Sequence, residues 1–193
     1  MLRKSEKRFG IKDMATVSMC VAFLAVSSWI TVPFVINFTL QTFAIFVVCS
    51  VFDVKISFCS VLSYLIIGIC GLPVFSGFGS GFSALAGPTG GYLVGFLVIP
   101  IIMHFFLRGN LNNTLRKVIS MTLGLLCCYI IGALWYYFGF NAGADISLWE
   151  IFVLCVFPFL IPDGIKIFLA VYISKRLSTF NLDNRIGGTN GNK

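Results

Sequence analysis

The sequence predicts an all-α integral membrane protein, a six-transmembrane-helix bundle with a Gly-rich outer loop between spans 3 and 4. Composition is the first observation behind this prediction. Of the 193 residues, 58% are apolar and 11% are charged, whereas a soluble domain carries about 25% charged residues. A soluble core of this size cannot absorb so much apolar surface, and a bilayer supplies the missing apolar solvent.

The charged residues are also grouped, which leaves long stretches without any of them. Residues 14–52, 56–107 and 118–144 contain no Asp, Glu, Lys or Arg, and these stretches are 39, 52 and 27 residues long. A helical span needs about 20 apolar residues. The first two stretches therefore have room for two spans each, and the third has room for one span and part of a loop.

The basic residues lie on one side of a six-span arrangement. With both termini in the cytoplasm, 13 of the 14 Lys and Arg residues fall in inner segments, and the outer loops near 32–37, 72–89 and 139–149 hold none. The positive-inside rule asks for this asymmetry, and an odd number of spans would break it. The net charge of +7 is therefore expected to anchor a multi-pass protein of the cell membrane to the inner leaflet, and not to bind nucleic acid.

Three parts of the chain follow from this topology. They are a basic cytoplasmic N-terminus (1–13), a six-helix membrane domain (14–177) and a polar cytoplasmic tail (178–193) that we expect to be disordered from Asn181. A basic start before an apolar stretch is also typical of a signal peptide. No small-x-small cleavage site follows, however, so the first helix is expected to stay. The first five spans are expected at 14–31, 38–53, 56–71, 90–107 and 118–138.

The last apolar segment contains two prolines, Pro158 and Pro162. Each removes a helix donor and clashes with the preceding turn. We therefore expect a separate short helix at 147–157, and a sixth span that begins with Pro162 at its first position and runs inward to about residue 177.

This sixth span carries Asp163 and Lys166 near its start, and Lys166 is the one basic residue outside the inner segments. A spacing of three places both side chains on one helical face. An ionisable residue inside a span is costly and indicates a functional site by default. The alternative is a structural ion pair, although burying such a pair seldom stabilises a protein.

The segment 71–91 contains seven glycines and no charge, and it connects spans 3 and 4 on the outer side. Irregular backbone at membrane depth is tolerated only where it is buried in protein or lines a cavity. A flexible linker is the alternative, but the apolar residues here would be poor linker residues in water. The pattern therefore favours a folded lid over a pocket.

Two further features are less specific. Polar residues open the second span, and Gln41 among them could contact a ligand or cap and connect helices. A stripe of small residues lies on one face of the first span, and it could pack inside the bundle or against a partner subunit. Its members are Ala15, Ser18, Ala22 and Ala25.

Several kinds of chemistry find no support in the sequence. It contains no GxxxxGK[ST] phosphate loop and no HExxH motif. The only histidine, His104, is expected near the inner side of the membrane, and the seven cysteines lie in apolar stretches without a CxxC pair. We therefore expect no metal site, no cofactor and no enzymatic activity, which leaves a membrane enzyme acting on a lipid as a weak alternative.

Four motifs stand in the sequence, namely Thr39-Leu40-Gln41-Thr42, Gly71-Leu72-Pro73-Val74-Phe75, Gly87-Pro88-Thr89-Gly90-Gly91-Tyr92 and Pro162-Asp163-Gly164-Ile165-Lys166. Together they resemble the BioY family, the biotin-specific S components of energy-coupling-factor (ECF) transporters. The similarity covers roughly residues 14–176. It implies a six-helix fold with an outer pocket capped by the loop between spans 3 and 4, and high-affinity binding of biotin for uptake. Another vitamin on the same architecture is the alternative.

The resemblance also implies partners, namely one ECF transmembrane coupling protein and two ATPase subunits that use ATP. In that family the whole subunit tips in the membrane to release its ligand inward, and small residues on the first helix face the coupling protein. This similarity gives the small-residue stripe of the first span a role as a partner interface.

The ligand-binding residues expected on this basis match the chemistry of biotin. Asp163 can accept hydrogen bonds from the two ureido N–H groups and Lys166 can donate to an oxygen, in charge-assisted bonds. The apolar ring and chain would pack on aromatic walls. Some BioY proteins carry Arg where this chain has Leu93, so the partner of the carboxylate stays open between Lys166, loop amides and Ser80. The expected set is Gln41, Phe75, Phe78, Gly79, Ser80, Tyr92, Asp163 and Lys166.

Overall fold

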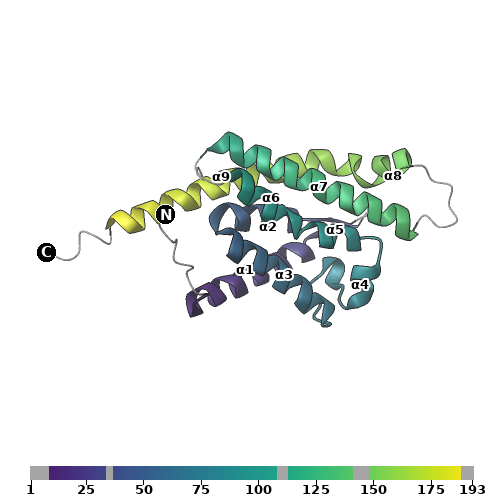
Figure 1. Ribbon diagram of the computed structural model, residues 1–193, viewed down its shortest axis with the longest axis horizontal. Helices are drawn as coiled ribbons and strands as arrows, with labels where there is room; N and C mark the ends of the chain where they lie inside the picture. The colour runs from purple at the N-terminus through teal and green to yellow at the C-terminus, as the bar shows by residue number, and fades with distance from the viewer. Residues whose placement is uncertain (1–8, 34–36, 108–112, 141–147, 188–193) are drawn as a thin grey trace, which may run out of the picture.

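The computed structural model describes residues 9–33, 37–107, 113–140 and 148–187 (Figure 1). Within these residues the chain is mostly helical and has one two-stranded antiparallel hairpin, in which Thr31 pairs with Thr39 and Val32 with Phe38. The long helices run beside one another along the longest axis of the molecule. The elements are α1 (Ile11–Trp29), β1 (Thr31–Val32), β2 (Phe38–Thr39), α2 (Gln41–Val51), α3 (Val54–Ile69), η1 (Ser76–Phe78), α4 (Phe82–Ala86), α5 (Gly90–Gly95), α6 (Val98–Leu107), α7 (Thr114–Phe140), α8 (Leu148–Cys155) and α9 (Phe157–Gly187).

Four helical segments of the described chain are long and apolar enough to cross a membrane, and their bounds are Ile11–Trp29, Gly90–Leu107, Thr114–Gly139 and Phe157–Leu177. The helices α2 and α3 are also apolar but have only 11 and 16 residues. At 1.5 Å per residue, α2 is about 17 Å long, well short of the ~30 Å hydrocarbon core. The chain is thus a multi-pass membrane protein of helices, in which α2 and α3 are shorter than a typical span.

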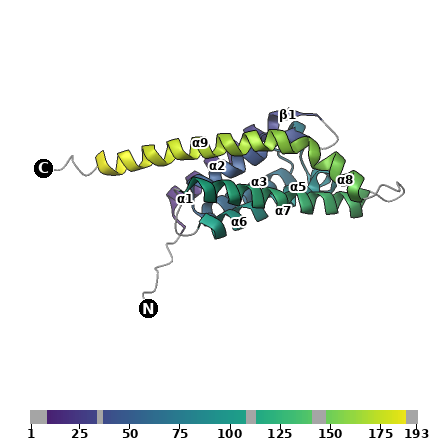
Figure 2. The same ribbon diagram turned by 90° about the horizontal axis from the view of Figure 1, so that it is seen from above.

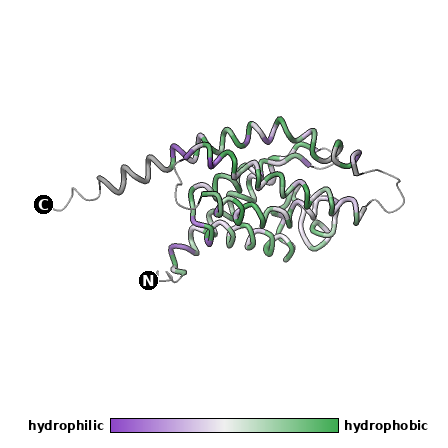
Figure 3. Tube along the Cα trace, turned by 45° about the horizontal axis from the view of Figure 1, so that its top comes forward, coloured by the Kyte–Doolittle hydropathy of each residue, from purple (hydrophilic) through white to green (hydrophobic). Residues whose placement is uncertain are grey.

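Apolar residues predominate along the helices (Figure 3), and many large ones are exposed. Phe105, Phe138 and Ile161 are each more than 70% exposed. A soluble protein rarely gathers so many large apolar side chains on its surface. A lipid environment solvates them without penalty, which is why a chain with so few charges can expose these faces.

The second span differs from its expected bounds of 38–53. Residues Phe38 and Thr39 form β2 instead of helix, and α2 begins at Gln41. The reason is the pairing with β1, which folds the segment after α1 back on itself. The fourth span has its expected bounds, Gly90–Leu107, although a turn separates α5, which ends at Gly95, from α6, which begins at Val98.

The predicted start of the last span at Pro162 was wrong by more than one helical turn. A separate short helix, α8, does precede it, but α9 begins at Phe157 and continues through Pro162. Pro158 is the second residue of α9, where a backbone N–H has no partner within the helix, so it takes the role expected of Pro162. Pro162 then removes one hydrogen bond without ending the helix. Asp163 and Lys166 consequently lie in the second and third turns of α9.

The end of the chain also differs from expectation. The helix α9 continues to Gly187, whereas disorder was expected from Asn181. Residues 188–193 lie outside the described part. Figure 2 shows the long α9 extending past the other helices of the bundle at this end.

Glycines allow α5 to lie very close to α7. A Cβ atom on Gly91 would come within 2.3 Å of Trp135, and one on Gly132 would come within 2.5 Å of the Tyr92 ring. A Cβ on Gly95 would meet the Cys128 sulfur at 2.8 Å. Any larger residue would force these helices apart, so the glycines fix the positions of Tyr92 and Cys128 at the cavity described next.

Candidate functional site

The segment 71–91, which we call the lid, is folded and packs on the ends of α1 and α3. The Phe75 ring is buried against Gly68, where a Cβ would come within 2.2 Å of it, and meets the Tyr64 ring edge-on at 5.5 Å. The Tyr64 hydroxyl donates to the Val74 carbonyl at 2.8 Å. The lid bends at Gly77, whose φ of 64° is typical of glycine.

The C-terminal end of α1 holds the lid from the other side. The Trp29 Nε1 donates to the Pro73 carbonyl at 2.8 Å, and the Trp29 ring stacks on Phe78 with 5.1 Å between ring centroids. The Ser28 hydroxyl donates to the Val74 carbonyl. Asn37 Nδ2 donates to the Ser76 Oγ at 3.0 Å. The expectation of a folded lid is confirmed by these contacts, which leave little of the lid backbone as a free linker.

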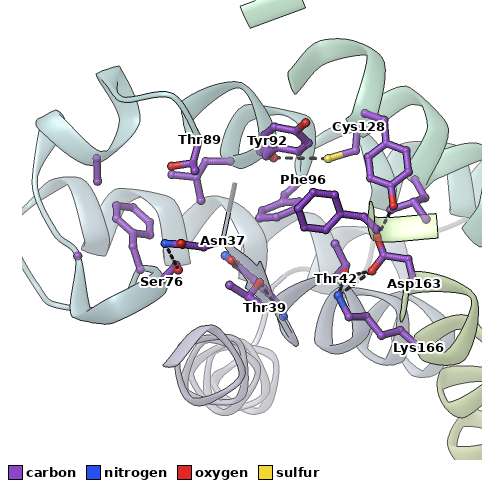
Figure 4. A pocket seen from close by; sticks show the side chains of 18 residues that line it. Asn37, Thr39, Thr42, Ser76, Thr89, Tyr92, Phe96, Cys128, Asp163 and Lys166 are labelled. Carbon is purple, nitrogen blue, oxygen red and sulfur yellow. Dashed lines mark hydrogen bonds and ion pairs between the residues drawn. The ribbon is translucent and has the colours of Figure 1, made fainter. Parts of the chain in front are cut away.

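A cavity lies between the lid and the helices, with about 800 Å³ of empty space including the part open to solvent. Its walls combine apolar and aromatic side chains with a few polar ones (Figure 4). The lining residues are Asn37, Thr39, Gln41, Thr42, Phe75, Ser76, Gly79, Ala84, Thr89, Tyr92, Leu93, Phe96, Leu125, Cys128, Tyr129, Phe159, Asp163 and Lys166.

An ion pair forms one end of the cavity. Lys166 Nζ lies 2.6 Å from Asp163 Oδ1, as the spacing of three on one helix predicts. Both side chains are buried, at 5% and 3% exposure. Since a buried ion pair needs further hydrogen bonds to offset its desolvation, the partners of these two groups decide whether the pair is tolerated.

Two other helices supply those partners. The Thr42 hydroxyl, near the start of α2, lies 3.4 Å from Asp163 Oδ1 and accepts from Lys166 Nζ at 3.1 Å. The Tyr129 hydroxyl of α7 donates to Asp163 Oδ2. The Lys166 ammonium also lies 3.9 Å from the centroid of the Phe38 ring, a cation–π contact that strengthens when water is excluded. The cluster formed by Asp163, Lys166, Thr42 and Tyr129 thus joins α2, α7 and α9.

Gln41 carries an unsatisfied donor into this site. Its side chain is 3% exposed and lines the cavity. Among the described residues its Nε2 is the one buried side-chain nitrogen or oxygen without a hydrogen-bond partner. An unpaired buried amide is costly, and a bound molecule with an acceptor would remove that penalty.

Six of the eight expected ligand-binding residues line the cavity, namely Gln41, Phe75, Gly79, Tyr92, Asp163 and Lys166. Phe78 and Ser80 do not. Phe78 has a φ of 59° and is 62% exposed, because its ring turns outward onto Trp29. Leu93, the residue found where some relatives carry Arg, also lines the cavity.

Sequence reasoning missed the contribution of α7. Tyr129 and Cys128 both line the cavity, but neither was expected there. A possible signal was a tyrosine in the middle of a charge-free span, three residues before Gly132, since a hydroxyl at membrane depth requires a hydrogen-bond partner.

The small-residue stripe of α1 is divided between two environments. Ala15, Ser18 and Ala22 are exposed, and Ala25 is buried in the bundle. The Ser18 hydroxyl donates to the Met14 carbonyl of its own helix. Most of the stripe therefore faces outward, where a close helix approach is possible.

No group of three or more His, Cys, Asp or Glu residues that could hold a metal ion occurs within the described part of the chain. The six cysteines whose side chains are described there are free.

Apolar helices with exposed faces, packed around a cavity that ends in a buried polar cluster, define a multi-pass membrane protein with an internal small-molecule site. The BioY family profile matches residues 3–181. The chain belongs to the BioY family.

Individual relatives agree with this assignment. A "Probable biotin transporter BioY" of Pyrococcus horikoshii is 37% identical over 169 residues, which are 86% of this chain and 96% of that protein. The "Biotin transporter BioY" of Thermotoga maritima is 29% identical over 177 residues, covering 90% and 99% of the two chains. A crystal structure of the "S-component for biotin from an ECF-type ABC transporter" is similar with a TM-score of 0.78 and 25% identity, over 93% of this chain and 95% of that one.

Proposed function

We propose that this chain is the high-affinity biotin-binding subunit, or S component, of an ECF-type ABC transporter that mediates biotin uptake. The observation that carries the proposal is the cavity itself, with the buried Asp163–Lys166 pair at one end and the unpaired Gln41 amide in its wall. The similar proteins are named as biotin transporters or as an S component for biotin, and these names indicate biotin as the substrate.

The chemistry of the cluster fits the ureido head of biotin. That head offers two N–H donors and one carbonyl acceptor. Asp163 is an acceptor, and Lys166 and the Gln41 amide are donors, all lining the same cavity. Charge-assisted hydrogen bonds of this kind are about twice as strong as neutral ones. The apolar remainder of the ligand would pack on Phe75 and Tyr92.

The proposal includes six crossings of the membrane. The four long segments, together with α2 and α3, give six. The helices α2 and α3 are short for a crossing, but the hairpin before α2 and the lid after α3 continue these elements along the chain. Irregular backbone at membrane depth is tolerated where it lines a cavity. The positive-inside rule then places both termini in the cytoplasm and the lid outside.

Transport requires partners that use ATP, namely an ECF transmembrane coupling protein and two ATPase subunits. The exposed small residues of α1, Ala15, Ser18 and Ala22, would allow a partner helix to approach closely. No nucleic acid and no metal is part of this function.

A binding titration tests the proposal directly. The purified full chain in lipid nanodiscs should bind labelled biotin tightly and in a 1:1 ratio. Excess unlabelled biotin should displace the label, and other vitamins of similar size should not. An absence of saturable binding of labelled biotin would reject biotin as the ligand, and an absence of saturable binding of any labelled vitamin would reject an S component.

A further inference from the structure

The charged residues of the cavity all lie at one end. Of its lining residues only Asp163 and Lys166 carry a charge. Figure 4 shows Asn37, Ser76 and Thr89 on the opposite side of the cavity from this pair, with Thr39 between. The lid end is therefore lined by hydroxyl and amide groups, and by no ionised side chain of the described residues.

Among the residues that the structure describes, none supplies a cation to the lid end. Every lining residue other than Lys166 lies within 13–54, 56–107 or 118–165, and none of these segments contains Lys or Arg. The nearest basic residues along the chain stand at the far ends of α1, α3 and α7 from the lid, at Lys12, Lys55 and Lys117.

Several backbone amides of the lid are already bonded within the lid or to α3. The amide of Phe75 donates to the Gly79 carbonyl at 3.0 Å, and that of Gly79 donates to the Ser76 carbonyl at 3.2 Å. The Gly81 amide donates to the Gly68 carbonyl at 2.7 Å, and the Gly90 amide to Gly87 at 3.0 Å. The Asn37 amide has a second N–H besides the one that it donates to Ser76, and Thr89 adds a hydroxyl, so uncharged donors are available to a ligand at this end.

Lys166 is a poor partner for a ligand carboxylate as well. Its charge is matched by Asp163 at 2.6 Å, so the cluster is neutral as a whole. An anion that approached Lys166 would also approach the Asp163 carboxylate, and like charges at close range repel. Burying an anion without a free cation is unfavourable.

We propose that this site does not recognise the negative charge of its ligand, and that it binds the ligand's tail through neutral hydrogen bonds at the lid end. Its substrate class thus includes uncharged biotin derivatives, in particular biotin amide, along with the free acid. This inference rests on the proposed function, because it takes the ureido head to occupy the Asp163 end.

The test compares two competitors on the unmodified chain. Purified full-length protein in nanodiscs is loaded with labelled biotin, and unlabelled biotin and biotin amide are titrated against it at neutral pH. The two inhibition constants should agree within tenfold. A preference of more than tenfold for the acid would overturn the inference while leaving biotin binding intact, whereas a failure of labelled biotin to bind would reject the proposed function itself.

A variant distinguishes the two possible orientations of the ligand. In Lys166→Gln the affinities for acid and amide should fall by the same factor, because Lys166 contacts a part of the molecule that both share. A selective loss for the acid would identify Lys166 as the carboxylate's partner and would contradict the inference. The competition on the unmodified chain decides the question even where this variant folds poorly.

Discussion

The two ends of the cavity are built in different ways. At the Asp163 end, side chains from the three helices α2, α7 and α9 converge in a closed network of one ion pair and its hydrogen bonds. At the lid end, a short irregular segment is held by single hydrogen bonds and ring contacts from α1 and the hairpin. The first arrangement suits recognition of a fixed head group. The second suits a cover that must open, because loops with few contacts open at low free energy.

The largest expected loss of biotin affinity comes from a substitution at the Asp163 end of the cavity. Asp163→Asn should weaken biotin binding by about 100-fold or more, since hydrogen bonds to a charged group contribute ~1.5–3 kcal/mol each and Lys166 would lose its partner. The measurement is equilibrium binding to the purified variant. Asp53→Asn, at the exposed N-terminal end of α3, is the matched control and should bind normally. Equal affinity of the two variants would remove Asp163 from the site.

A second substitution at the same end tests how the Asp163 carboxylate is oriented, and it should cost less affinity. Tyr129→Phe removes only the hydroxyl that donates to Asp163 Oδ2, and a hydrogen bond to a charged group of this kind predicts a loss of roughly tenfold or somewhat more. Tyr137→Phe on the same helix is the control. Titration calorimetry of both variants measures the difference, and an unchanged Tyr129→Phe would mean that the other partners hold Asp163 by themselves.

The same division into two ends explains what the sequence could predict. The Asp163–Lys166 pair was predictable because a spacing of three is a local property of a helix. The folded lid was predictable from its composition of glycine and apolar residues. Tyr129 was not, since it lies 34 residues away from Asp163 and only the packing of α7 on α9 brings them together. Phe78 was misplaced for a similar reason, because its direction depends on the turn at Gly77 and on the ring of Trp29.

Substitutions at the lid end should change the rates of biotin binding and release more than the affinity. Trp29→Ala removes the hydrogen bond to Pro73 and the stacking on Phe78, each contributing about 1 kcal/mol. We expect dissociation of biotin to become about five- to tenfold faster, with association accelerated in part as well. Stopped-flow release measures this, with Trp149→Ala as control, since Trp149 is an exposed residue of α8. An unchanged release rate would show that the lid does not limit exit.

The smallest effect should come from a single neutral donor at the lid. Ser76→Ala removes the hydroxyl that accepts from Asn37 Nδ2 and lies 3.0 Å from the Thr31 hydroxyl. A neutral hydrogen bond contributes ~0.5–1.5 kcal/mol, so affinity should fall about threefold, and by the same factor for biotin and biotin amide. Ser83→Ala in α4, outside the cavity lining, is the control. A loss as large as that of Asp163→Asn would mean that the lid end, and not the buried ion pair, dominates recognition, because neutral groups would then contribute as much as the charged cluster.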